Sequence, residues 1–224
     1  MGFSHLGDQG ILATFATEAE ALGFAANVRA ARIPAVLDVV PAYFSVAVYH
    51  DPTLASCAEL AKSLANLPAS RVQKKKTVGK RHLIPCCYDL GPDLPRVAEH
   101  TGLTIPELIR LHSESEYTVY AIGFCPGFPY LGYLPKPLCG VQRLPSPRLR
   151  VEPGSVGLTG RQTGIYPLER PGGWNLIGQT PLELVNLADG YLPIVAGDRV
   201  KFEPIERGEF QRLRGRRLAP FGLG

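Results

Sequence analysis

The most informative segment of the chain is Ile122-Gly-Phe-Cys-Pro-Gly-Phe-Pro-Tyr-Leu-Gly132, where glycine, proline and aromatic residues are neighbours. Two segments of similar composition follow, Pro153-Gly-Ser-Val-Gly-Leu-Thr-Gly-Arg-Gln-Thr-Gly-Ile-Tyr-Pro167 and Arg170-Pro-Gly-Gly-Trp-Asn-Leu-Ile-Gly178. Glycine permits positive φ and close approach of the backbone, whereas proline fixes φ and removes an amide donor. Disordered Gly/Pro segments lack this apolar and aromatic content, so the composition predicts short strands and shaped turns around a pocket.

Around these segments the sequence predicts a domain of short strands. Helical periodicity is absent from Tyr117 onward, and strands are expected at 117–124, 148–151, 155–158, 164–166, 174–179 and 199–204. Many short strands separated by turn signals indicate a barrel or a sandwich. Before them we expect a strand at 84–88 and helices at 93–100 and 104–112, the second opened by a capping box from Thr104 to Glu107.

Residues 1–80 are predicted to form a separate domain. Strands are expected at 10–15, 36–40 and 44–49, with helices starting at the capping box Thr17 to Glu20 and at Asp51-Pro52. A strand around 78–84 would complete a split β-α-β, ferredoxin-like arrangement. The basic stretch 70–81 is the expected boundary, so the predicted fold class is α+β, with residues 81–224 forming the second, β-rich domain.

The composition is that of a globular protein with a sizeable core. Of 224 residues, 45% are hydrophobic and 20% are charged with mixed signs, which argues against disorder. No apolar run approaches the roughly 18 residues of a membrane span, and the N-terminus lacks the basic start and apolar run of a signal peptide. We therefore expect a cytoplasmic protein without a membrane partner.

The five cysteines are expected to be reduced thiols. Their number is odd, no Cys-x-x-Cys occurs, and no histidine lies at the spacing of a zinc ligand. No metal site is therefore expected.

The formal net charge of +4 is a mild excess. It comes largely from the runs Lys74-Lys75-Lys76 with Lys80-Arg81 and, in the tail, from Arg212, Arg214, Arg216 and Arg217. A nucleic-acid surface is one interpretation. Neither run carries a recognition motif or interleaved aromatics, so a solvated linker and a frayed tail are favoured, and no nucleic-acid partner is expected.

Several signatures of catalysis are missing, among them the Gly-x4-Gly-Lys-Ser/Thr phosphate loop, the Gly-x-Ser-x-Gly elbow and the His-Glu-x-x-His helix. The segment 157–164 could present backbone amides and Arg161 to an anion, but a tight turn with an exposed arginine is favoured. Cys125 could be a nucleophile, but no partner that would activate it is evident, so a small residue lining a pocket is favoured.

His112 and a pair of arginines are the candidates for catalysis and charge recognition. His112 lies at a predicted helix end, where it could act as a general base or could interact favourably with the helix dipole. Arg143 and Arg148 flank the rigid segment 144–147. Their planar donors suit carboxylate or phosphate groups, and ligand recognition and a solvated loop remain equally open.

The aromatic residues in these turns suit a pocket with one wet end, although core packing is at least as good an interpretation for Phe124. His112 and Arg148 are the catalytic candidates. The substrate-binding candidates are Phe124, Gly127, Phe128, Tyr130, Arg143, Arg148, Gly160, Gln162, Thr163, Tyr166, Gly172, Gly173 and Trp174.

A further set of short motifs occurs in order along the chain. They are Ile84-Pro85 with Tyr88, Gly91-Pro-Asp-Leu94, Leu111-His-Ser113 before Tyr117-Thr-Val-Tyr120, Gly123 to Leu131, Pro147-Arg148, Gly154-Ser-Val-Gly157, Gln162 to Pro167, Pro171 to Trp174, and Gly197-Asp-Arg-Val200 with Phe202. In these motifs the chain resembles the 5-oxoprolinase B-subunit (PxpB) family, also described as allophanate hydrolase subunit 1 or the kinase-inhibitor KipI family. The N-terminal portion fits more loosely, through Gly7-Asp8 and Val40 to Tyr43.

The resemblance implies a small α/β domain followed by a cyclophilin-like β-barrel. It also implies two partners, the C-subunit and the A-subunit of the enzyme, with which the chain opens 5-oxoproline to glutamate at the expense of ATP. ATP, with Mg, would be shared with these partners and not bound by this chain alone, which would be inactive by itself. No catalytic residue is carried over from the family.

Two other branches of the family leave alternatives open. One is a regulatory module that inhibits a sensor histidine kinase. The other is the carboxyltransferase half of a urea carboxylase or allophanate hydrolase type system, although the chain has no biotin-attachment Met-Lys-Met. A component of the 5-oxoprolinase enzyme is the favoured hypothesis.

Overall fold

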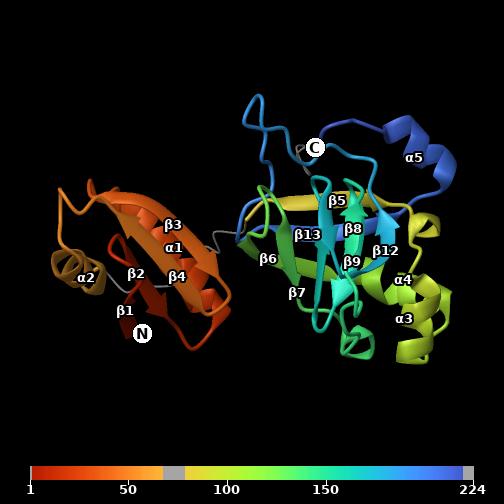
Figure 1. Ribbon diagram of the computed structural model, residues 1–224, viewed down its shortest axis with the longest axis horizontal. Helices are drawn as coiled ribbons and strands as arrows, with labels where there is room; N and C mark the ends of the chain where they lie inside the picture. The colour runs from red at the N-terminus through yellow and green to blue at the C-terminus, as the bar shows by residue number, and fades with distance from the viewer. Residues whose placement is uncertain (1, 68–78, 219–224) are drawn as a thin grey trace. The chain divides into compact units, whose positions relative to one another are not determined.

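The computed structural model describes residues 2–67 and 79–218. The chain divides into two compact units, Met1–Val78 and Gly79–Gly224, each of which has its own core (Figure 1). The lysine run 74–76 lies outside the described residues. In the described part of the chain, no helix combines the length and the apolar character needed to cross a membrane.

The N-terminal unit is an antiparallel sheet with the strand order β1-β2-β4-β3. Its strands are β1 (Gly2–His5), β2 (Gly10–Thr14), β3 (Val36–Ala42) and β4 (Ser45–His50). The strand expected around 78–84 does not complete this sheet. The edge position is taken by β1, which the sequence did not reveal because its short Gly-Phe-Ser-His segment has no apolar alternation.

Helices α1 (Glu18–Ala31) and α2 (Cys57–Ala65) cover one face of this sheet and share its core. The capping box at Thr17 is confirmed, since its side chain accepts from Glu20 N–H. The predicted start of α2 at Asp51 is wrong. Asp51 accepts hydrogen bonds from Thr53 in a local turn, and the helix begins after the capping box of Ser56 and Glu59.

The C-terminal unit is built on a sheet with the strand order β5-β13-β6-β7-β10-β9-β12. The pairs are antiparallel except β5 with β13. Backbone hydrogen bonds of 2.8 and 3.1 Å join Cys87, just after β5, to Gln179 at the end of β12. The bounds are β5 (Arg81–Cys86), β6 (Glu116–Ile122), β7 (Pro129–Gly132), β9 (Ser155–Thr159), β10 (Gln162–Ile165), β12 (Asn175–Gln179) and β13 (Arg199–Pro204).

Short helices close the two ends of this unit. The described ones are the 3-10 turns η1 (Tyr88–Leu90) and η2 (Lys136–Leu138) and the helices α3 (Leu94–Thr101), α4 (Ile105–Glu114) and α5 (Arg207–Leu213). Helices α3 and α4 lie together at the end opposite α5 (Figure 1). The capping box of Thr104 and Glu107 is confirmed at the start of α4. Helix α5 was not expected, because the arginine-rich tail was interpreted as frayed.

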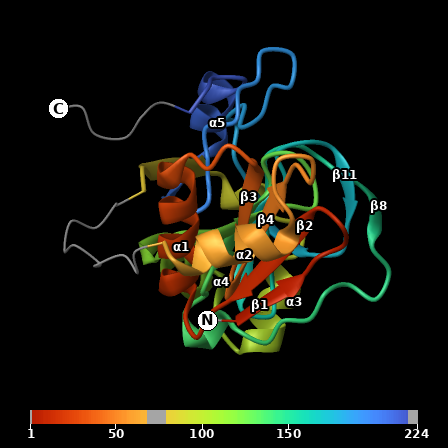
Figure 2. The ribbon, with the colours of Figure 1, turned by 90° about the vertical axis from the view of Figure 1, so that its left-hand side faces the viewer.

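A separate two-stranded ribbon pairs β8 (Arg148–Val151) with β11 (Arg170–Gly172). Figure 2 shows it along an outer edge of the C-terminal unit. The strand predicted at 148–151 is confirmed, although it pairs with β11 and not with the main sheet. Leu149 on this ribbon is 92% exposed, whereas Val151 at the end of β8 is buried and packs in a small hydrophobic cluster with Phe128 and Trp174.

Candidate functional site

The pleat of the C-terminal sheet sorts the candidate residues onto two faces. On β10 and just after it, Thr163 and Ile165 point to the main core, whereas Gly164 and Tyr166 belong to the opposite face. Successive side chains of a strand alternate in this way. The predicted set is therefore not one pocket, because His112 and Thr163 lie on the core side and the aromatic residues lie on the outer side.

The outer face carries an aromatic cluster, which we define as Phe124, Phe128, Tyr130, Tyr166 and Trp174. The Phe128 ring meets Tyr166 and Trp174 edge to face, with centroids 5.2 and 5.5 Å apart. Such edge-to-face pairs are the geometry that the ring quadrupoles favour. The structure thus brings these five predicted residues together.

Glycines form the floor beneath the rings. A Cβ at Gly164 would lie 3.1 Å from both Phe128 and Trp174, and a Cβ at Gly157 would lie 3.1 Å from Trp174 Cβ. A Cβ at Gly172 would overlap the Tyr166 hydroxyl. The rings pack directly on the backbone because these positions have no side chain.

Phe124 is the exposed member of the aromatic cluster, with 59% of its surface accessible. It lies in a tight turn in which Cys125 N–H donates to the Gly123 carbonyl at 2.7 Å and Phe128 N–H donates to the Cys125 carbonyl at 3.1 Å. Its φ of 65° is in the left-handed region, which a bulky residue rarely occupies. The turn therefore holds an aromatic ring in solvent, edge to face with Phe128 at 5.4 Å, and pure core packing of Phe124 is ruled out.

Arginines surround this cluster. Arg143 is exposed, and its charge counteracts the effect of burial, which raises the pKa of the Tyr130 and Tyr166 hydroxyls. Arg170 hydrogen-bonds Cys125, whose pKa is raised by burial. Cys125 is 8% exposed and stays protonated, which supports the pocket-lining interpretation over the nucleophile.

The Arg148 guanidinium has hydrogen-bond partners within the protein. One of its terminal nitrogens contacts both carboxylate oxygens of Asp93, at 2.7 and 2.9 Å, and the other lies 3.5 Å from the Trp174 carbonyl. Asp93 is buried and also accepts from Leu176 N–H at 2.7 Å. A solvated loop is thus wrong for Arg148, whose guanidinium joins the β8–β11 ribbon to the start of α3.

His112 is fully buried on α4 and lies in a chain of hydrogen bonds. Its Nδ1 is 2.7 Å from Tyr88 Oη, its Nε2 is 2.9 Å from Thr163 Oγ1, and the Thr163 hydroxyl donates to the Gly157 carbonyl at 3.0 Å. This pattern is satisfied by a neutral imidazole that donates from Nε2. Burial lowers the pKa of His112 to about 3. The prediction that this histidine carries a charge that interacts with the helix dipole is therefore wrong.

The segment 157–164 is the β9–β10 hairpin. Gln162 pairs with Thr159, and Gly160 N–H donates to the Val141 carbonyl at 2.7 Å. Arg161 lies 4.2 Å above the ring of Tyr133. The Gly160 amide is therefore used inside the fold, and the hairpin with its exposed Arg161 agrees with the tight-turn interpretation.

Known proteins share this sequence and geometry. Residues 1–190 match the protein family described as "Carboxyltransferase domain, subdomain C and D". The 5-oxoprolinase B-subunit of Bacillus subtilis (strain 168) is 36% identical over 199 residues, which cover 83% of this chain and 82% of that protein. The chain belongs to the 5-oxoprolinase B-subunit family.

Solved structures agree with this membership. The crystal structure of TTHA0988 superposes with a TM-score of 0.78 at 36% identity over 88% of this chain. This chain spans 40% of the length of TTHA0988. Urea carboxylase of Kluyveromyces lactis superposes with a TM-score of 0.71 over 94% of this chain, and at 17% identity it shows the fold alone. The mixed α+β fold with a large antiparallel sheet is therefore shared with these proteins.

Asp93 is the buried partner of Arg148 in this 5-oxoprolinase B-subunit homologue, and sequence reasoning did not include it among the site residues. It lies 55 positions from Arg148, so no local pattern links the two residues. Its signal was present in the Gly91-Pro-Asp-Leu94 motif, but only as part of the resemblance.

The described residues bear on whether this family member could hold a metal ion or another small ligand. Among residues 2–67 and 79–218, no group of three or more His, Cys, Asp or Glu side chains could hold a metal ion. A hollow of about 210 Å³ lies between α1 and β3 of the N-terminal unit and is lined by Arg29, Arg32 and Asp38 among others. It includes none of the predicted site residues.

Proposed function

We propose that the chain is one component of an ATP-dependent 5-oxoprolinase, in which 5-oxoproline, ATP and water give glutamate, ADP and phosphate. The observation that carries this proposal is the 36% identity to a 5-oxoprolinase B-subunit across 83% of the chain. Its partners would be homologues of the C-subunit and the A-subunit. We propose a cytoplasmic location for this enzyme.

We propose that the aromatic cluster is the part of the substrate site that this chain supplies. The substrate offers a small ring, a carboxylate and a lactam carbonyl. Phe124 presents an exposed ring face, and Arg143 has planar donors suited to a carboxylate. Burial raises the pKa of Tyr130, so its hydroxyl remains a neutral donor for a carbonyl oxygen at physiological pH.

The other predicted residues support this site from within the fold. Arg148 is held by Asp93, and His112 with Thr163 lies on the core side of the sheet. Gln162 and the glycines 127, 160, 172 and 173 shape the turns and hairpins around the cluster. We assign no catalytic residue, because His112 is buried on the core side and Arg148 is held by Asp93.

The residues of this chain do not fit a Mg–ATP site of their own. The sequence has no phosphate loop, and the Gly160 amide in the β9–β10 hairpin donates to the Val141 carbonyl. We therefore assign no step through the nucleotide to this chain. The proposal places nucleotide binding on the partner proteins.

The finer description of the fold is also a proposal. The bridge from Cys87 to Gln179 links the strands at the two ends of the C-terminal sheet, which supports a closed, cyclophilin-like barrel for residues 81–224. For residues 1–80, the strand order β1-β2-β4-β3 with two helices on one face supports a ferredoxin-like split β-α-β domain.

The family description favours one second candidate, the carboxyltransferase half of a biotin-dependent carboxylase. The two functions differ in the product that an assay would detect. The 5-oxoprolinase forms glutamate in proportion to ATP hydrolysed, whereas the carboxyltransferase consumes carboxybiotin. Each is assayed with the C-subunit homologue present.

The test is reconstitution with the A-subunit and C-subunit homologues. We expect glutamate formation only when this chain is present, and no activity from this chain alone. Phe124→Ala should lower kcat/KM roughly tenfold or more. Phe44→Ala, which removes another exposed phenylalanine on the N-terminal unit, is the matched control and should have no effect. Equal activity without this chain would contradict the proposal.

A further inference from the structure

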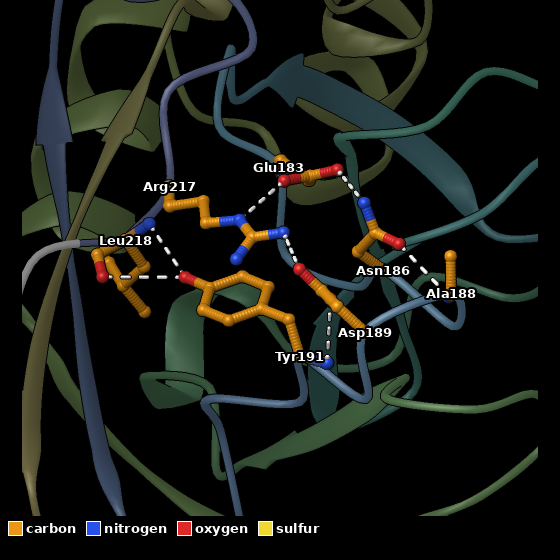
Figure 3. A network of polar contacts seen from close by, with 7 residues as sticks. All are labelled: Glu183, Asn186, Ala188, Asp189, Tyr191, Arg217 and Leu218. Atoms are coloured by element: carbon orange, nitrogen blue, oxygen red, sulfur yellow. Dashed lines mark hydrogen bonds and ion pairs between the residues drawn. The ribbon is translucent and has the colours of Figure 1, made fainter.

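The chain after α5 lies along the loop 181–192 of the same unit (Figure 3). Gly215 N–H donates to the Pro181 carbonyl at 2.9 Å, and Glu183 N–H donates to the Arg216 carbonyl at 2.9 Å. The Leu218 N–H donates to Tyr191 Oη at 2.8 Å. The tail is therefore an ordered strap, and the expectation of a frayed end is wrong for these residues.

Arg217 is the centre of this strap. Its Nε donates to Glu183 Oε2 at 2.9 Å, a terminal nitrogen contacts Asp189, and the guanidinium lies 4.5 Å from the centre of the Tyr191 ring. Hydrogen bonds from Arg217 lower the pKa of both carboxyls. A single exposed ion pair contributes little to stability. The planar guanidinium of Arg217, however, contacts two carboxylates and an aromatic ring at once and so constrains the geometry of the loop. We call this arrangement the tail clamp.

The clamped loop packs on the turn that bears Phe124. A Cβ at Gly127 would overlap Val185 and come within 3.2 Å of Leu192. Gly127 has a φ of 73° and no side chain, so the loop touches its backbone directly. Phe128, the next residue, is in ring contact with Trp174 at 5.5 Å. A displacement of the loop therefore acts on the turn and through it on the aromatic cluster.

We propose that Arg217 is a positioning residue for the aromatic cluster, which holds the turn 123–128 in place by clamping the loop 181–192. Arg217 touches none of the five rings of the cluster, and its effect passes through the packing of Val185 and Leu192 on Gly127. The activity readout of this inference rests on the proposed function, but its structural readout does not.

Trp174 supplies that structural readout, because it is the single tryptophan of the chain and is 5% exposed. We expect Arg217→Gln to increase acrylamide quenching of its fluorescence by about twofold or more and to raise KM for 5-oxoproline by about 2- to 30-fold, with a smaller change in kcat. Arg217→Lys should restore the wild-type quenching and the wild-type KM only in part, since a single point charge cannot bridge the two carboxylates. Arg212→Gln, which removes the same charge from an exposed side chain on α5, is the matched control.

The outcomes separate the two proposals. Trp174 quenching that is equal in Arg217→Gln and Arg212→Gln overturns the tail clamp. Increased quenching with no 5-oxoprolinase activity in the wild type supports the tail clamp and overturns the proposed function. If Arg217→Gln does not fold, Asp189→Asn removes one of the two ion pairs and should give an increase in the same direction; unchanged quenching in that variant overturns the clamp.

Discussion

At the scale of single residues, the outer face of the C-terminal sheet depends on positions that have no side chain. A Cβ at Gly157 would lie 3.1 Å from Trp174, and a Cβ at Gly164 would lie 3.1 Å from both Phe128 and Trp174. The space next to these two backbone positions is therefore filled by the aromatic residues. A methyl group at either position must lift an aromatic ring or move the backbone.

We predict that Gly164→Ala destabilises the protein by roughly 1–3 kcal/mol, the range typical of overpacking. Its Cβ would stand 2.9 Å from the Pro129 carbonyl and 3.1 Å from two rings. The control is Gly23→Ala on α1, where a Cβ meets nothing within 4 Å and a gain of about 0.5–1 kcal/mol is expected. Urea unfolding measures both variants, and equal effects would contradict the packing argument.

At the scale of elements, helix α4 and strand β10 are joined by polar contacts inside an apolar core. A series of hydrogen bonds runs from Tyr88 through His112 and Thr163 to the Gly157 carbonyl. In it, the Tyr88 hydroxyl, both ring nitrogens of His112 and the Thr163 hydroxyl each have a partner. A neutral imidazole satisfies the chain, whereas a protonated one would present Nδ1–H to a hydroxyl that must then turn away. The network thus specifies how the helix docks and also the charge state of the histidine.

The pH dependence of stability follows from this network. The pKa of His112 falls from 6.5 to about 3 on folding, so the unfolded chain binds a proton that the folded chain does not. The stability from this group is present above pH 6.5 and is lost as the pH falls toward 3, which amounts to about 2 kcal/mol between pH 7 and pH 5. His112→Gln should remove that part of the slope.

Urea unfolding at a series of pH values measures these slopes. The control is His100→Gln, because His100 is exposed on α3 and makes no contact with the buried network. Parallel pH profiles for the wild type and His112→Gln would contradict the assignment of a buried neutral histidine.

At the scale of the whole molecule, the separate cores decide which thiols can react. Cys86, Cys87 and Cys125 are buried, and burial raises the pKa of each. Cys57 and Cys139 are only partly buried. Reagents that attack the thiolate therefore distinguish the inside of the molecule from its surface.

We predict that 5,5′-dithiobis(2-nitrobenzoic acid) labels the native protein at Cys57 and Cys139 first. The three buried thiols should react roughly tenfold more slowly or less, and all five should react in denaturant. Peptide mapping by mass spectrometry identifies the labelled positions. Early labelling of Cys86, which is 0% exposed, would contradict the core described for the C-terminal unit.

Much of the local structure was predictable because its causes lie within a few residues. The capping boxes at Thr17 and Thr104 place side-chain and backbone partners three residues apart, and both formed as expected. The segment rich in glycine and aromatics around Phe124 became strands and tight turns. The alternation of side chains between the two faces of β10 follows from the strand period of two residues. Thr163 was nevertheless predicted to lie with the aromatic residues, because the prediction rested on the glycine-rich and aromatic composition of the segment and not on this alternation.

The starts of α1 and α4, the turns and the mixed α+β class could therefore be read from the amino-acid sequence, since hydrogen bonds and steric limits between near neighbours set them. Three features depend on the tertiary structure: the ion pair between Asp93 and Arg148, the burial of His112 as a neutral imidazole, and the contacts of Arg217 with the loop 181–192. Each of these pairs residues that are far apart along the chain. Their contacts depend on the path of the whole backbone, which no local pattern records.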